Sequence, residues 1–228
     1  MKLWDLSLPD DGLAIVAGRP GMGKSYVAIE IANEMNRNGT KAVLIYADGV
    51  KSHDIVHYEN GEVHTFPSKL SRVNSVYPEI PFVVVDGGEW LSPFGWERFL
   101  TDYIDHEKPQ AVFINSIIIP RENASEELLQ TIQHIAKEKH IIVFVEINVT
   151  RAVECRKEKR PKPKDVKCTM TARQYVDQFV FVYRDVYYLE DGKEKSDSIE
   201  VYTADGEKTI LPFNPQKYAI EKSIDREG

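Results

Sequence analysis

The chain has 228 residues, of which 42% are hydrophobic and 29% charged, the composition of an ordinary globular protein. This length suits one α/β domain that spans residues 1–228. The formal net charge of −7 excludes a protein that binds polyanions over its whole surface, so contact with nucleic acid requires a local basic patch.

The first strong motif is G-x-x-x-x-G-K-S at residues 18–25. An apolar run at residues 13–17 predicts a buried strand before it, and apolar residues at helical spacing from residue 26 onward predict a helix after it. Glycines let backbone N–H groups surround a phosphate chain, and a helix N-terminus favours negative charge. In this context the motif predicts a nucleotide-binding phosphate loop rather than a chance glycine-rich turn.

Two side chains of this loop carry the expected chemistry. Lys24 is predicted to reach the β- and γ-phosphates of ATP and so to act in catalysis, and Ser25 is predicted to ligate Mg²⁺. ATP and Mg²⁺ are therefore the expected cofactors. The residues expected to contact the nucleotide are Gly18, Arg19, Pro20, Gly21, Met22, Gly23, Lys24, Ser25 and Tyr26.

Strand-like and helix-like segments alternate along the next part of the chain. Near-continuous apolar strands separated by helices are typical of a mostly parallel sheet with helices on both faces, so the expected fold class is α/β. Strands are predicted at residues 42–46, 63–66, 82–85, 111–114 and 141–147, and helices at residues 96–106 and 125–139.

The last third of the chain differs in character. Residues 151–167 contain eight Lys or Arg and three acidic residues, and Pro161 and Pro163 exclude a regular helix or central strand, so a long basic loop is expected. Antiparallel hairpins, at about residues 179–220, are expected to extend the parallel core. The segments behind this prediction are a short helix at 171–177, strands at 179–183, 186–189, 198–202 and 208–211, and the turn signals Asp191-Gly192 and Asp205-Gly206.

The two cysteines, Cys155 and Cys168, fit neither a disulfide framework nor a four-ligand zinc site. Reduced thiols favour a cytosolic compartment. No apolar run is long enough to span a bilayer, and the first five residues do not begin a signal peptide. We therefore expect a cytoplasmic protein that does not contact a membrane.

Three stretches resemble the C-terminal motor domain of DnaB-type replicative hexameric helicases, a branch of the RecA-like ATPases. They are residues 8–25, with the Arg-Pro-x-Met-Gly-Lys form of the loop, residues 146–161, which include Arg151-Ala152-Val153-Glu154-Cys155-Arg156, and residues 165–185, which end in Tyr183-Arg184-Asp185. The resemblance implies a RecA-like P-loop fold, a Mg²⁺-dependent ATPase, single-stranded DNA as partner and a homo-oligomeric ring or filament. The family's separate N-terminal domain is expected to be absent, because the first strand begins so close to Met1.

The sequence departs from the family's pattern at three places where no other residue is a candidate for the expected role. Asp48 stands where the resemblance implies a catalytic, water-activating acid, which is usually Glu. Glu146 stands at the γ-phosphate-sensing Gln, and residues 202–208 lack the Arg of the family's Lys-x-Arg pair. An arginine finger contributes roughly 10³–10⁵ in rate, so its loss argues against fast hydrolysis.

The acidic position that holds Mg²⁺ in the family matches Asn115, whose amide is a weaker partner for a hard cation. Asp86 also ends an apolar strand, as in the generic Walker B pattern, and is the better metal partner by chemistry. Its alternative role is to begin the turn before Gly87-Gly88. The candidate metal residues are thus Ser25, Asp86 and Asn115, and the choice between the last two stays open.

The basic loop is the main nucleic-acid signal, because a channel contact with single-stranded backbone requires local positive charge in an acidic protein. The alternative is a solvated loop without a partner. The candidate DNA-binding residues are Arg151, Arg156, Lys157, Lys159, Arg160, Lys162 and Lys164.

The leading functional hypothesis is an ATP-binding, RecA-like protein that hydrolyses ATP and acts on single-stranded DNA in replication or recombination. Small single-domain proteins of this kind are associated with phages. The rival hypothesis is a degenerate nucleotide-binding protein with little turnover, which serves a true helicase or another replication protein as loader, regulator or partner.

Overall fold

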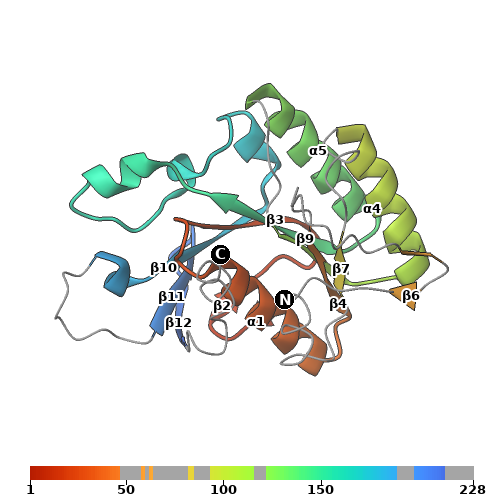
Figure 1. Ribbon diagram of the computed structural model, residues 1–228, viewed down its shortest axis with the longest axis horizontal. Helices are drawn as coiled ribbons and strands as arrows, with labels where there is room; N and C mark the ends of the chain where they lie inside the picture. The colour runs from red at the N-terminus through yellow and green to blue at the C-terminus, as the bar shows by residue number, and fades with distance from the viewer. Residues whose placement is uncertain are drawn as a thin grey trace, which may run out of the picture.

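The computed structural model describes residues 1–46, 58–59, 62–63, 82–84, 93–115, 122–188 and 198–213 (Figure 1). Asp48, Asp86 and the predicted Asp191-Gly192 turn lie outside these residues. The described elements are, in chain order, β1 (Lys2–Leu3), β2 (Leu6–Ser7), β3 (Gly12–Gly18), α1 (Lys24–Arg37), β4 (Ala42–Tyr46), β5 (Tyr58–Glu59), β6 (Glu62–Val63), β7 (Phe82–Val84), α4 (Pro93–Glu107), β8 (Ala111–Asn115), α5 (Glu122–Glu138), β9 (Ile142–Asn148), the 3₁₀ helices η1 (Arg151–Cys155), η2 (Pro163–Asp165) and η3 (Ala172–Tyr175), β10 (Gln178–Tyr183), the 3₁₀ helix η4 (Asp185–Tyr188), β11 (Ser198–Thr203) and β12 (Lys208–Pro212).

In the described part of the chain, eight strands form one sheet in the order β12-β11-β10-β3-β9-β8-β4-β7. The six strands from β10 to β7 run parallel, and β11 and β12 extend the sheet antiparallel beyond β10. β3 buries all seven of its residues, as expected for a central parallel strand that is covered on both faces. The predicted parallel core with C-terminal antiparallel strands is confirmed.

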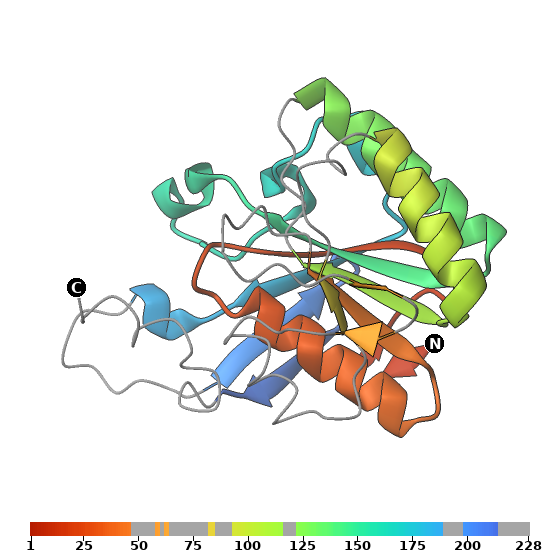
Figure 2. The same cartoon turned by 45° about the vertical axis from the view of Figure 1, so that its right-hand side comes forward.

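Helices cover both faces of the sheet (Figures 1 and 2). α1 packs on one face, where Val27, Ile31 and Met35 join alternate strand residues such as Val16 and Phe144 in one buried cluster. α4 and α5 pack on the other face with the intervening strand residues. The strands alternate between these two clusters because successive side chains point to opposite faces. Within the described residues, no helix is both long and apolar enough to cross a membrane.

Two predicted elements differ from the structure. The strand predicted at residues 186–189 is wrong, because β10 ends at Tyr183 and the chain turns into η4. This turn brings Tyr188 back against Tyr183, with ring centroids 6.0 Å apart, so Tyr188 packs on the neighbouring ring without joining the sheet. The helix predicted at residues 171–177 is only the single 3₁₀ turn of η3.

Candidate nucleotide and nucleic-acid site

The predicted phosphate loop lies between the carboxyl end of β3 and the start of α1, the position at which parallel sheets bind phosphate. Gly21 and Gly23 have φ values of 80° and 93°, in the left-handed region that favours glycine. Gly23 is the N-cap of α1 and offers no side chain to its N–H groups, and the first turn contains no acidic residue. These backbone donors are therefore suited to an anionic ligand.

Lys24 and Ser25 occupy the first turn of α1. The Lys24 ammonium lies 3.5 Å from the carbonyl oxygen of Arg19, and burial lowers the pKa of Lys24. The Ser25 hydroxyl donates a 2.9 Å hydrogen bond to Oε2 of Glu146. Burial raises the pKa of Glu146 to about 7, and the hydrogen bond from Ser25 and the charge of Lys24 oppose that rise. A lysine, a hydroxyl and a buried carboxyl group thus meet where the loop enters the helix.

The Arg19 side chain joins the phosphate loop to the basic loop. Its Nε lies 2.8 Å from Oε1 of Glu154 in η1, and a terminal nitrogen lies 3.4 Å from the carbonyl oxygen of Val149. The Arg19 side chain is 9% exposed and the Glu154 side chain is 35% exposed, so the ion pair is buried on its Arg19 side only. Removal of Glu154 would leave the buried Arg19 guanidinium without its charged partner.

The strand order bears on the open choice between Asn115 and Asp86. Asn115 is the last residue of β8, which only β9 separates from β3. The described strand that precedes Asp86 in the sequence is β7. It lies at the edge of the sheet, and β9, β8 and β4 separate it from β3. Asn115 therefore lies on the strand nearer the phosphate loop. Asp48 and Asp86 themselves lie outside the described residues.

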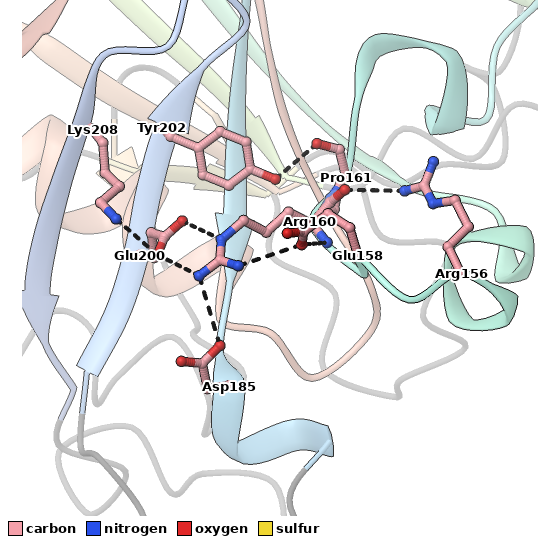
Figure 3. Close-up of polar contacts among 8 residues, drawn as sticks. All are labelled: Arg156, Glu158, Arg160, Pro161, Asp185, Glu200, Tyr202 and Lys208. Atoms are coloured by element: carbon pink, nitrogen blue, oxygen red, sulfur yellow. Dashed lines mark hydrogen bonds and ion pairs between the residues drawn. The ribbon is translucent and has the colours of Figure 1, made fainter.

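Arg160 holds the basic loop, residues 151–167, against β11, and Arg156 makes contacts within the loop (Figure 3). Arg160 makes a bidentate contact with Glu200 of β11, at 2.7 and 3.0 Å, and lies over the ring of Tyr183 at 4.7 Å. Arg156 makes a second bidentate contact, with the buried Asp165, at 3.0 and 2.8 Å. The Tyr202 hydroxyl donates to the carbonyl oxygen of Pro161 at 2.8 Å.

The predicted basic loop is held by these side-chain contacts, and several of its cations have partners within the protein. The loop is held by one ion pair within it, Arg156 with Asp165, and by one to β11, Arg160 with Glu200. Arg156 and Arg160 use their guanidinium groups internally, and Lys159 lies over the ring of Tyr188 at 4.4 Å. The predicted DNA-binding residues that stay exposed are Arg151, Lys157, Lys162 and Lys164.

Replacing Arg160 with alanine is expected to lower the free energy of unfolding by about 1–3 kcal/mol, because it leaves the half-buried Glu200 without its bidentate partner. Urea unfolding measures the change. Arg98→Ala is the control, since Arg98 and its partner Asp102 are each 74% exposed and 3.9 Å apart, and such pairs contribute less than about 1 kcal/mol. Equal losses in the two variants would contradict the anchoring role of Arg160.

The sequence predicted the phosphate loop, but not the acidic partners that bind Arg19 and the basic loop. In the sequence, Glu154 stands out only as part of a motif. Nothing in the sequence indicates a role for Glu200, because a glutamate on an alternating strand is ordinary. The structure brings Lys24, Ser25 and Glu146 together, and it ties Arg19 to the basic loop.

Comparison with known sequences finds relatives among the DnaB-type helicases. Residues 101–213 match the family model of the DnaB-like helicase C-terminal domain. The replicative DNA helicase DnaB of Pasteurella multocida (strain Pm70) is 23% identical over 216 residues, which cover 82% of this chain and 45% of the relative. DnaB of Rickettsia prowazekii (strain Madrid E) is 39% identical over 69 residues, 30% of this chain and 14% of the relative. The chain thus spans less than half the length of these relatives.

Two solved structures share the fold. The first, an ATPase domain, matches with a TM-score of 0.62 and 21% identity, covering 88% of this chain and 80% of that one. The second, a DnaB-like replicative helicase described with its interactions with primase, matches with a TM-score of 0.63 and 22% identity, covering 88% of this chain and 54% of that one. The fold is RecA-like, and the chain is related to the DnaB-like helicase C-terminal domain family, as its motifs predicted.

Proposed function

We propose that this protein binds ATP with Mg²⁺ at residues 18–26 and uses its hydrolysis to act on single-stranded DNA in replication or recombination. The proposal rests on a contact between the phosphate loop and the basic loop. The Arg19–Glu154 ion pair connects the loop suited to phosphate with the basic loop suited to nucleic-acid backbone. In this proposal, a change in either loop is transmitted to the other through this contact, whose Arg19 side is buried.

Each group has a separate part in this proposal. Lys24 and the N–H groups of the first turn of α1 bind the phosphates, and Ser25 holds Mg²⁺, which would neutralise charge on the transferred phosphoryl group. Asp48, by its place in the family pattern, is the proposed acid that activates water. Arg151, Lys157, Lys162 and Lys164 would follow the DNA backbone with exposed charge. A homo-oligomeric ring or filament, and replication proteins as partners, belong to the same proposal.

The second candidate function is an accessory protein that binds nucleotide with little turnover. Specific observations favour it, namely the uncharged Asn115 at the end of β8 and the absence of Arg from residues 202–208. A helicase partner rather than DNA would then receive the nucleotide-dependent change.

The proposed function is tested by measuring oligothymidylate affinity with no nucleotide, with ADP and with a non-hydrolysable ATP analogue. When two sites are coupled, the affinity of one typically changes by about 5- to 150-fold when the other is occupied. By reciprocity, DNA must change the affinity for the analogue by the same factor. We expect the analogue to change DNA affinity within this range. DNA binding that is indifferent to nucleotide, in a protein that binds ATP, would favour the accessory role.

A further inference from the structure

Asn115 and Glu146 lie at one level of the sheet, on neighbouring strands. β8 pairs with β9 in parallel with Ile114 opposite Val145, so the next residue of each strand is Asn115 or Glu146. Adjacent strands are about 4.8 Å apart, so these two positions are direct neighbours. The acid that the family pattern places at Asn115 is therefore missing from one strand, while a carboxyl group stands on the strand beside it.

Both side chains lie on the face of the sheet that α1 covers. Two residues earlier, Phe113 and Phe144 stack with ring centroids 4.3 Å apart and belong to the buried cluster that contains α1. Because strand side chains alternate with a period of two, Asn115 and Glu146 follow on the same face. Glu146 is 7% exposed, and its Oε2 lies 2.9 Å from the Ser25 hydroxyl in the first turn of α1.

We propose that Glu146 supplies the carboxylate of the Mg²⁺ site, in place of the acid absent at Asn115. This inference rests on the proposed function, since it assumes that the phosphate loop binds Mg²⁺·ATP. Mg²⁺ is usually held by one or two carboxylates together with substrate phosphates and water. Glu146 adds negative charge next to Ser25, and because it accepts the hydrogen bond that the Ser25 hydroxyl donates, the Ser25 oxygen lone pairs stay free for the cation.

The remaining ligands of such a site come from the nucleotide and from water. Within the described residues, no group of three or more His, Cys, Asp or Glu side chains is arranged to hold a metal ion by itself. The Glu146 carboxylate on β9 and the Ser25 hydroxyl at the start of α1 instead form a half-site, which the phosphates complete. This arrangement predicts that the cation binds together with ATP and weakly without it.

The test compares ATP affinity in excess Mg²⁺ and in EDTA by titration calorimetry, for the wild type, Glu146→Gln, and Glu146→Gln combined with Asn115→Asp. Glu146→Gln has nearly the same shape and is expected to bind ATP in EDTA at least as well as the wild type. The factor by which Mg²⁺ increases its ATP affinity should be about 10- to 100-fold smaller than in the wild type, the range expected for one charged contact. Asn115→Asp should restore most of that gain, because it returns the carboxylate to the neighbouring strand.

An independent readout is Mn²⁺ bound in the presence of ATP, measured by electron paramagnetic resonance, which does not depend on turnover. Bound Mn²⁺ should fall in Glu146→Gln and return in the double variant. A full Mg²⁺ gain in Glu146→Gln, or no Mg²⁺ gain in a wild type that binds ATP, would overturn the inference and leave nucleotide binding intact. A wild type that binds no ATP in either buffer would overturn the proposed function as well.

Discussion

Replacement of Lys24 by alanine is expected to weaken Mg²⁺·ATP binding about 10- to 100-fold, since a hydrogen bond to a charged group contributes roughly 1.5–3 kcal/mol. The Lys24 side chain is partly buried at the start of α1, and this burial lowers the pKa of Lys24 because the charged form loses contact with water. Phosphate oxygens would restore that solvation. Calorimetric titration with ATP, and the rise in melting temperature that ATP produces, measure the effect.

Arg37→Ala is the matched control for Lys24→Ala. Arg37 is a basic residue of the same helix, 64% exposed, and contacts Glu34 at 3.8 Å. It ends α1, about 20 Å from Lys24 at 1.5 Å per residue, so it cannot reach the same ligand. ATP affinity should be unchanged in Arg37→Ala. An equal loss in the two variants would mean that the phosphate loop is not the site of ATP binding.

The exchange of Lys157 and Lys162 for glutamine is expected to weaken binding of single-stranded DNA and to make it less dependent on salt. Both side chains are exposed on the basic loop. Each contact with a single-strand phosphate contributes about −0.7 to the slope of log affinity against log salt, so loss of two should reduce the slope by about 1.4. Fluorescence anisotropy with oligothymidylate between about 50 and 200 mM salt provides this slope.

The control for the loop variant removes the same charge elsewhere. Lys2 and Lys108 are exposed and lie outside the basic loop, so Lys2→Gln combined with Lys108→Gln changes the net charge equally. Its salt slope should match that of the wild type. If both double variants lose affinity alike, long-range attraction rather than contact through the loop explains DNA binding.

The parts of the fold that depend on local sequence were predictable. The phosphate loop follows from glycines at fixed spacing, and two of them, Gly21 and Gly23, adopt the positive φ that the motif requires. The buried strands follow from apolar runs, and the hairpin of β11 and β12 follows from Asp205-Gly206. The predicted strand at 186–189 failed because a short apolar run does not reveal whether it packs in a sheet or against a neighbouring ring.

The contacts that define the candidate site were beyond local patterns. Ser25 and Glu146 are 121 residues apart, and Arg19 and Glu154 are 135 apart, so only the folded sheet brings them together. The sequence marked Glu146 as a departure, but the register of β8 and β9 is what places it beside Asn115. In the same way, internal partners for Arg156 and Arg160 required the tertiary structure.

The central claim is that ATP turnover at the phosphate loop is coupled to single-stranded DNA. The most direct measurement is steady-state ATP hydrolysis by the wild type and by Lys24→Ala while oligothymidylate is added at low salt. We expect turnover that rises with DNA in the wild type and is absent in the variant. An absence of turnover at every DNA concentration, in a wild type whose melting temperature ATP still raises, would contradict the claim.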